Sequence, residues 1–289
     1  MSNNFKFFSR LAWGNWKLTN GLDNPKNKAQ HIESVFNNKI LVIDTSDIYG
    51  NYNNEEILGK ALADVGFDRA SYQVVTKGNI FNNHPDYKHI QGHHYDSSYN
   101  YLKSEIERSL NKLQTPYIDL YLLHRLDYLL NPVETAKVLK EYYDKGLIKA
   151  VGVSNFPTST IRMLQKYLDI PISTNQIEFS LKQLSPLDDG SLDLAIENGY
   201  QPMFWSPYAR GEIFKEGNIL DCLKKYATKY NATIEAIATS WLLKHPAKGV
   251  IVIGSNNKDR ISSMAKGVDI NLEAHEWYDI LKATGKILP

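Results

Sequence analysis

The chain has 289 residues, of which 43% are hydrophobic and 22% charged, and its formal net charge is +1. This globular balance lacks the positive charge of a nucleic-acid-binding surface, and no apolar run approaches the length of a membrane span. The N-terminus lacks the apolar stretch of a signal peptide, and a single cysteine, Cys222, excludes an internal disulfide. We therefore expect a cytoplasmic protein, with residues 1–289 forming one domain that binds neither membrane nor nucleic acid.

Short apolar runs of strand length alternate along the chain with segments of helical periodicity. Residues 40–43 are four consecutive apolar residues, which suits a strand buried on both faces. Leu102, Ile106 and Leu110 recur at the spacing of one helix face. In chain order the patterns predict a strand at 11–16, a helix at 27–37, a strand at 40–44, a helix at 53–64, a strand at 72–76, a long loop at 78–96, a helix at 98–113, a strand at 118–123, a helix at 132–144, a strand at 148–153, a helix at 157–167, a strand at 172–175, a helix at 188–198, a strand at 201–205, helices at 217–230 and 233–244, a strand at 250–253, and helices at 257–265 and 272–284.

Eight short strands separated mostly by helices predict a parallel sheet, and eight such units in a chain of this length predict a (β/α)8 barrel, also called a TIM barrel. The main alternative is a doubly wound open sheet. That fold favours a G-x-G-x-x-G motif after the first strand, where Gly14 stands alone. The loop at 78–96 is long enough to predict a lid or a substrate rim.

Polar residues follow most of the expected strands at their C-terminal ends, where the active sites of such barrels lie. Asp44, Lys77 and His124 end the second, third and fourth strands, which are neighbours in a barrel. Tyr49 lies five residues beyond Asp44. The later strands end in Ser154 with Asn155, Gln176, Ser206 and Ser255.

Four of these residues can together polarise a carbonyl group and give it a proton. A tyrosine has an ordinary pKa of about 10, and a neighbouring ammonium group lowers that value. Lys77 can supply the charge for Tyr49, and Asp44 can be its counter-ion. His124 can donate a hydrogen bond to an oxygen beside the Tyr49 hydroxyl. Reduction of the carbonyl also needs an electron pair for its carbon atom, which these four residues do not supply. A hydride from a nicotinamide cofactor is the simplest source.

The remaining strand ends carry groups that suit a nicotinamide dinucleotide. Amide and hydroxyl groups can bind a carboxamide, an indole can stack on the ring, and cations near a helix start suit a 2′-phosphate. The expected cofactor contacts are Gly14, Asn15, Trp16, Ser154, Asn155, Gln176, Trp205, Ser206, Tyr208, Gly211, Ser255, Asn256, Lys258 and Arg260, and the expected substrate contacts are Trp16, Tyr49, His124 and Arg125.

These motifs resemble the aldo-keto reductase family, from about residue 11 to 264. Residues 44–50 (DTSDIYG) look like its Asp-Thr-Ala-x-x-Tyr-Gly motif. Later signatures match in order and spacing at residues 75–77 (VTK), 123–124 (LH), 152–156 (GVSNF), 175–176 (NQ) and 253–255 (IGS). The sequence is most similar to a bacterial branch of generic NADPH-dependent oxidoreductases.

The resemblance implies NADPH-dependent reduction of aldehydes or ketones to alcohols, with NADPH preferred to NADH. It implies Tyr49 as proton donor, Lys77 lowering its pKa, Asp44 paired with Lys77, and His124 positioning the carbonyl. It also implies that Ser154, Asn155, Gln176 and Trp205 surround the nicotinamide, with Ser255 and Arg260 near the 2′-phosphate. The partner is then a small carbonyl compound, and the protein is a monomer or a small homo-oligomer.

Two departures from the family pattern are visible. Gly254 stands where many relatives carry a phosphate-binding lysine, for which Lys258 is the candidate substitute. The segment after residue 265 is short, so the loop that closes the pocket in many relatives is expected to be absent. We expect an open substrate site shaped mainly by residues 78–96, Trp16 and Arg125.

Several alternatives stay open at this point. A binding or regulatory barrel could use the nicotinamide as a redox-sensing ligand, although the complete catalytic set favours an enzyme. A cofactor-free hydrolase or isomerase would leave Trp205 and residues 255–260 without a role. Arg125 can bind a substrate carboxylate or pair with Asp127. We expect no metal, because His84, His93 and His94 lack a usual ligand spacing, and we expect Trp13, Trp241 and Trp277 to serve packing.

Overall fold

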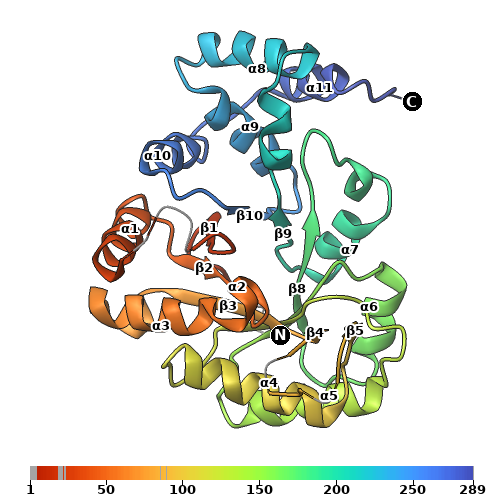
Figure 1. Cartoon of the computed structure of the whole chain (residues 1–289). Coiled ribbons are helices and arrows are strands. Elements are labelled where there is room, and N and C mark those ends of the chain that lie inside the picture. Colours follow the sequence, from red (N-terminus) through yellow and green to blue (C-terminus); the bar gives the residue numbers. More distant parts are fainter. Residues whose placement is uncertain (1–4, 19–21, 23, 85, 89, 289) are drawn as a thin grey trace.

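Eight parallel strands close into a barrel in the order β1-β10-β9-β8-β7-β6-β3-β2, with helices around the outside (Figure 1). The computed structural model describes residues 5–18, 22, 24–84, 86–88 and 90–288. The expected (β/α)8 barrel is therefore confirmed, and the open-sheet alternative is wrong. The barrel strands are β1 (Leu11–Gly14), β2 (Val42–Asp44), β3 (Gln73–Gly78), β6 (Leu120–Leu123), β7 (Val151–Ser154), β8 (Ile172–Glu178), β9 (Met203–Trp205) and β10 (Val250–Ile253).

The outer helices begin at capping residues that the sequence supplies. The side chains of Asn24, Ser98 and Asn131 each accept a hydrogen bond from an amide of the following turn, and a proline comes directly after Asn24 and Asn131. The helices are α1 (Pro25–Asn37), α2 (Tyr49–Tyr52), α3 (Asn54–Val65), α4 (Tyr99–Lys112), α5 (Pro132–Asp144), α6 (Thr158–Gln165), α7 (Ser191–Asn198), α8 (Asn218–Lys229), α9 (Ile234–Leu243), α10 (Lys258–Lys266) and α11 (Ala274–Ala283), with short 3-10 turns at Arg69–Ser71, Ser185–Leu187 and Ala209–Phe214.

The alternation of side chains along the strands brings two polar residues to the mouth of the barrel. Alternate residues of a barrel strand point inward. Val42 and Val75 belong to the small apolar cluster formed by the inward-facing side chains. Asp44 and Lys77 each lie two residues further along β2 and β3, so their side chains continue these inward rows at the C-terminal end of the barrel.

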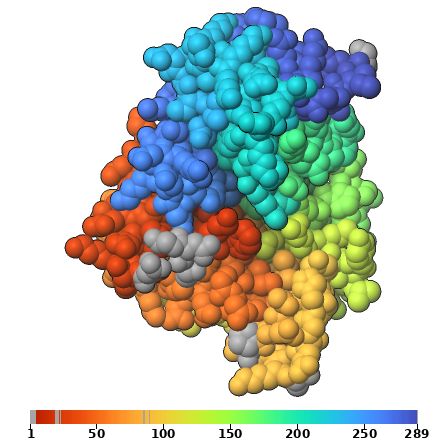
Figure 2. All heavy atoms as spheres, turned by 45° about the horizontal axis from the view of Figure 1, so that its top comes forward, coloured from red at the N-terminus to blue at the C-terminus, as the bar shows by residue number. Residues whose placement is uncertain are grey.

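The segment at 78–96 is not only a loop, and this expectation is corrected. It contains a two-stranded antiparallel hairpin of β4 (Ile80–Asn82) and β5 (His93–Tyr95). The hydroxyl groups of Tyr52 and Tyr101 both donate to the carbonyl oxygen of Ile80, at 3.4 and 3.3 Å. These bonds fix the base of the hairpin to α2 and α4, and the light orange part of the chain, which includes β5, forms a lobe at the lower edge of Figure 2.

The expected packing role of three tryptophans is confirmed. Trp13 and Trp241 are fully buried. The rings of Trp241 and Trp277 stack at 5.1 Å, and each indole donates to the backbone carbonyl of the other residue. This pair ties α9 to α11 on the outside of the barrel. Within the part of the chain that the structure describes, no helix has both the length and the apolar character needed to cross a membrane.

Candidate active site

Three neighbouring strands bring Asp44, Lys77 and His124 to one place. Asp44 is the last residue of β2, and β2 pairs with β3 so that Asp44 lies opposite Val75. Lys77 is the next-to-last residue of β3 and lies opposite Leu122 of β6, and His124 follows β6 directly. The predicted strand ended at residue 76, so Lys77 lies inside the strand rather than after it.

Lys77 is the centre of this group. Its side chain is 0% exposed, and its ammonium nitrogen donates to Asp44 Oδ2 at 2.8 Å and to the carbonyl oxygen of Thr45 at 2.7 Å. It also lies 3.4 Å from the Tyr49 hydroxyl oxygen. Burial lowers the pKa of Lys77, but Asp44 and Tyr49 raise it by more, and the net direction is upward. Lys77 is therefore a permanent cation beside the phenol.

Burial is the largest influence on the Tyr49 phenol. It raises the pKa of Tyr49, the Lys77 ammonium opposes this rise, and the net direction is upward. The lowering effect that Lys77 was expected to have on the pKa of Tyr49 is therefore present, but burial raises that pKa by more. A phenol with a raised pKa keeps its proton at neutral pH, as a proton donor must.

His124 is held neutral beside Tyr49. The two rings meet edge to face with their centroids 5.8 Å apart. Burial, and then the charges of Lys77 and Arg125, bring the pKa of His124 well below its usual range. Its Nδ1 lies 3.0 Å from the hydroxyl oxygen of Ser46, so Nε2 is the ring nitrogen left for a ligand.

Polar side chains continue along the next three strand ends as a connected chain. Gln176 Nε2 donates to Asp44 Oδ1 at 2.7 Å, and Ser154 Oγ donates to the carbonyl oxygen of Gln176 at 3.0 Å. Asn155 Nδ2 donates to Ser154 Oγ at 2.8 Å, and the Trp205 indole donates to Asn155 Oδ1 at 2.9 Å. These bonds fix the side chains of Ser154, Asn155, Gln176 and Trp205, all of which line the cavity above the barrel.

A cavity of about 640 Å³ lies over this end of the barrel. Most of the residues expected to contact cofactor or substrate line it. They are Gly14, Trp16, Asp44, Tyr49, His124, Arg125, Ser154, Asn155, Gln176, Trp205, Ser206, Tyr208, Gly211, Ser255 and Arg260.

Three expected cofactor contacts are not among the residues that line the cavity, and their roles stay predictions. The Asn15 side chain is fully buried, and its backbone amide donates to the carbonyl oxygen of Asp44. Asn256 Nδ2 donates to the carbonyl oxygen of Lys17 at 2.7 Å. Lys258 is exposed at the start of α10, two residues before the lining residue Arg260. Lys77 also lies outside the lining, because Asp44 and Tyr49 stand between its ammonium group and the cavity.

Sequence reasoning missed a second set of lining residues and overstated the role of one segment. None of the described residues of 78–96 lines the cavity, so the expectation that this segment shapes the pocket is wrong. Arg210 and Phe214 belong to the 3-10 turn after β9, near the identified residues Ser206, Tyr208 and Gly211. Gly254, identified from the sequence as standing in place of a phosphate-binding lysine, also lines the cavity. The residues missed are Lys17, Pro207, Arg210, Phe214, Ile234, Glu235, Val252 and Met264, of which only the charged ones carried a usable signal.

Arg125 faces the cavity rather than Asp127. Its guanidinium lies over the Trp205 ring, 5.7 Å from the centroid. The two carboxylate oxygens of Asp127 accept the amide hydrogens of Leu129 and Ser97, at 2.8 and 2.9 Å. Among the described residues no ion pair joins Asp127 to Arg125. The charge of Arg125 is thus available to a ligand.

Two histidines that had been weighed as metal ligands, His84 and His94, contact other side chains. His84 contacts Arg108 and lies 3.5 Å from Glu105, and His94 stacks on Phe81 with the ring centroids 4.4 Å apart. Within the described ranges no three His, Cys, Asp or Glu side chains are placed to hold a metal ion.

The fold and the site define a class of protein: a (β/α)8 barrel with a large cavity at its mouth, where a half-buried tyrosine stands beside a buried Lys–Asp pair. A family model described as "Aldo/keto reductase family" matches residues 10–284. The chain belongs to the aldo/keto reductase family and is an oxidoreductase, as the resemblance in its sequence implied.

Relatives match over nearly the whole chain. The uncharacterized oxidoreductase YcsN of Bacillus subtilis is 33% identical over 282 residues, covering 96% of this chain and 94% of the relative. The 6-dehydroglucose reductase of Agrobacterium fabrum is 33% identical over 275 residues, covering 94% and 93%. An aldo-keto reductase from Klebsiella pneumoniae, solved in complex with NADPH, has the same fold, with a TM-score of 0.79 at 20% identity and coverage of 97% and 94%. These comparisons do not favour the regulatory alternative.

Proposed function

We propose that this oxidoreductase reduces an aldehyde or ketone to an alcohol with NADPH, and that Tyr49 gives the proton. The observation that carries the proposal is the Lys77 ammonium, which lies 3.4 Å from the Tyr49 hydroxyl and 2.8 Å from Asp44, two residues that line a cavity of about 640 Å³. A neutral phenol beside a fixed cation can release a proton to a developing alkoxide.

The lining groups fit a nicotinamide dinucleotide. Amides and hydroxyls that can bind a carboxamide lie at the ends of β7 and β8, in Ser154, Asn155 and Gln176. Guanidinium groups that can bind phosphate also line the cavity, from Arg210 in the 3-10 turn after β9 and from Arg260 in α10. Bound NADPH supplies a hydride to the carbonyl carbon.

The chain's own residues perform the other parts of the reaction. The Nε2–H of neutral His124 orients the carbonyl oxygen toward the Tyr49 hydroxyl. As the carbon gains the hydride, the proton on Tyr49 Oη moves to the carbonyl oxygen, leaving a phenolate. Lys77 stabilises that phenolate, and Asp44 balances the charge of Lys77 before and after the transfer. A proton from solvent then restores the phenol.

The decisive measurement follows the nicotinamide absorbance of the purified protein with 4-nitrobenzaldehyde and either NADPH or NADH. Aldehyde-dependent oxidation with NADPH, faster than with NADH, is the expected result. A sugar-derived aldehyde serves as second substrate, because one relative is named 6-dehydroglucose reductase. Quenching of NADPH fluorescence on binding without any turnover would instead support a regulatory nicotinamide-binding protein.

Gly254 gives a direct test of where the 2′-phosphate lies. A β-carbon on Gly254 would meet no atom within 4 Å, so a longer side chain can enter the cavity near Arg260. We expect Gly254→Lys to lower KM for NADPH by about tenfold, the size of one added charged hydrogen bond, with little change for NADH. Steady-state kinetics with both cofactors measure this. Equal changes for NADPH and NADH would place the phosphate elsewhere.

Arg125 is proposed to bind the substrate, and the charge of the substrate tests this role. We expect Arg125→Met to raise KM for 4-carboxybenzaldehyde by about tenfold more than KM for 4-nitrobenzaldehyde, since a charged hydrogen bond is lost. Arg162→Met, which removes an exposed arginine from its pair with Glu197, is the control. An equal rise for both aldehydes would mean that Arg125 acts only by packing on Trp205.

A further inference from the structure

Ser46 lies next to the His124 ring, on the side of its Nδ1 atom. It is fully buried, and it stands where the family motif has alanine. Its Oγ lies 3.0 Å from His124 Nδ1, 2.9 Å from Asp47 Oδ1 and 3.2 Å from the carbonyl oxygen of Lys77. Three atoms thus compete for one hydroxyl hydrogen. The Lys77 carbonyl also accepts the amide hydrogen of Asp47 at 3.1 Å, and it is the most distant of the three atoms from Ser46 Oγ. The two closer candidates are His124 and Asp47.

The direction of the Ser46 hydroxyl decides which nitrogen of the neutral His124 carries hydrogen. If Ser46 donates to Asp47, then His124 Nδ1 must hold the hydrogen and donate to Ser46, which leaves Nε2 bare. If Ser46 donates to Nδ1, the hydrogen is on Nε2. Only the second arrangement lets His124 donate to a carbonyl oxygen in the cavity. The tautomer of His124 therefore depends on the state of Asp47.

The surroundings of Asp47 favour a neutral carboxylic acid. Its side chain is 2% exposed, and the amide of Ile48 donates to Oδ1 at 2.5 Å. Among the described residues, Oδ2 has no hydrogen-bond partner, and neither has the buried hydroxyl of Tyr121. Both atoms lie beside Gly78: a β-carbon there would be 2.1 Å from the Tyr121 hydroxyl and 3.4 Å from Asp47 Oδ2. An ionised carboxylate would not remain buried with an unpartnered oxygen.

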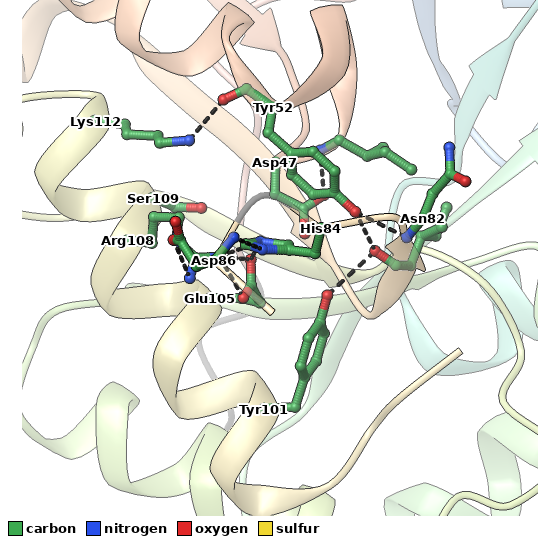
Figure 3. Close-up of polar contacts among 12 residues, drawn as sticks. Asp47, Tyr52, Asn82, His84, Asp86, Tyr101, Glu105, Arg108, Ser109 and Lys112 are labelled. Atoms are coloured by element: carbon green, nitrogen blue, oxygen red, sulfur yellow. Dashed lines mark hydrogen bonds and ion pairs between the residues drawn. The ribbon is translucent and has the colours of Figure 1, made fainter. Parts of the chain in front are cut away.

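The charges that surround Asp47 act in the same direction. Burial, and then the carboxyl groups of Glu105 on α4 and Glu55 on α3, raise the pKa of Asp47 well above its usual range. Glu105 is itself paired with Arg108 and lies beside His84, as Figure 3 shows below Asp47. Burial raises the pKa of the Tyr52, Tyr101 and Tyr121 hydroxyls, and the charge that Asp47 would carry if ionised adds to each rise.

We propose that Asp47 and Ser46 are positioning residues: Asp47 is a neutral acid with its hydrogen on Oδ2, and its Oδ1, which already accepts the Ile48 amide hydrogen, competes only weakly for the Ser46 hydroxyl hydrogen. Ser46 then donates to His124 Nδ1, and His124 is thereby fixed with its hydrogen on Nε2. No bond to carbon is made or broken in this relay, and each hydrogen stays on its own donor. The proposal rests on the proposed role of His124 as a hydrogen-bond donor to the substrate. It assigns a function to a carboxyl group that the reaction itself does not use.

The test reads the tautomer directly, without turnover. Nitrogen-15 chemical shifts of histidine distinguish a protonated from an unprotonated ring nitrogen, and the His124 signal is assigned by its loss in His124→Gln. We expect hydrogen on Nε2 in the wild type at neutral pH. In Ser46→Ala this preference is lost. In Asp47→Asn it is kept, because a carboxamide is uncharged like the acid and its oxygen can take the place of Oδ1 beside the Ile48 amide. Hydrogen on Nδ1 in the wild type, or no change in Ser46→Ala, would overturn the proposal.

Kinetics then separate positioning from mere packing. We expect kcat to fall by about tenfold in Ser46→Ala and in Asp47→Ala, with KM for NADPH unchanged, and Asp47→Asn to recover most of the loss. Ser240→Ala is the matched control: it removes a buried hydroxyl, bound to the carbonyl oxygen of Ile270 at 2.7 Å, and should alter neither the His124 tautomer nor kcat. Thermal melting of each variant checks its fold. If the tautomer shifts in Ser46→Ala but kcat does not, the donor role of His124 is wrong, and the proposal falls with it.

Discussion

Replacing Tyr49 with phenylalanine is expected to lower kcat for aldehyde reduction by roughly 10²- to 10⁴-fold, the range that general acids contribute. The ring itself has contacts that phenylalanine keeps: it meets His124 edge to face at 5.8 Å, and Lys77 lies 5.0 Å from its centroid. Only the hydroxyl and its 3.4 Å contact with Lys77 are lost. Initial rates of NADPH oxidation with 4-nitrobenzaldehyde, followed at the nicotinamide absorbance, measure the effect.

Binding of NADPH serves as the internal control for this variant. Because Tyr49→Phe removes no expected cofactor contact, fluorescence titration should give a dissociation constant within about twofold of the wild type. Equal turnover by wild type and variant would mean that another group gives the proton. A parallel loss of binding would mean that the substitution has disturbed the cavity.

The pH dependence of the wild-type rate follows from the pKa shifts of Tyr49 and His124. Reduction needs the protonated phenol, and burial raises the pKa of Tyr49, so the rate should fall only as pH rises through that raised value. The pKa of His124 lies well below its usual range because of burial, so His124 should contribute no acidic limb between about pH 6 and pH 8.

The barrel was predictable because its signals are local. Continuous apolar runs mark strands that are buried on both faces, and a polar residue at each run's end marks the mouth. Asp44, Lys77 and His124 follow from that rule alone. The hairpin of β4 and β5 was not predictable in this way. Each of its strands has three residues and includes polar side chains, so neither length nor periodicity distinguishes them from loop.

The parts of the site that were missed depend on tertiary packing. Ile234 and Glu235 begin α9 and Met264 belongs to α10, and these residues line the cavity only because tertiary packing brings both helices next to it. The raised pKa of Tyr49 also needs the structure, since a neighbouring lysine is visible in sequence but burial is not. Likewise, nothing in the residue types of Ser46 and Asp47 tells which way a hydroxyl hydrogen points.

Replacing Lys77 with methionine should reduce both activity and stability. Methionine fills the space without the charge, so the phenolate that forms on Tyr49 loses its stabilising cation. We expect kcat to fall by about 10²- to 10³-fold, the effect of removing one preorganised donor. Asp44 would keep its bond from Gln176 at 2.7 Å but lose its counter-ion. An uncompensated buried charge costs about 3–5 kcal/mol in free energy of unfolding, which chemical denaturation measures.

A double variant separates these two effects of Lys77. In Asp44→Asn with Lys77→Met, the buried charge is gone from both partners, and Gln176 can still bond to the residue at position 44. We expect most of the lost stability to return, because a neutral pair in a buried site is far less costly than one unpaired ion. Activity should stay as low as in Lys77→Met, because the cation next to Tyr49 is still missing. Recovery of activity together with stability would show that Lys77 holds Asp44 in place but does not act on Tyr49. Recovery of stability alone would show that the ion pair serves the phenol, and that its structural role can be replaced.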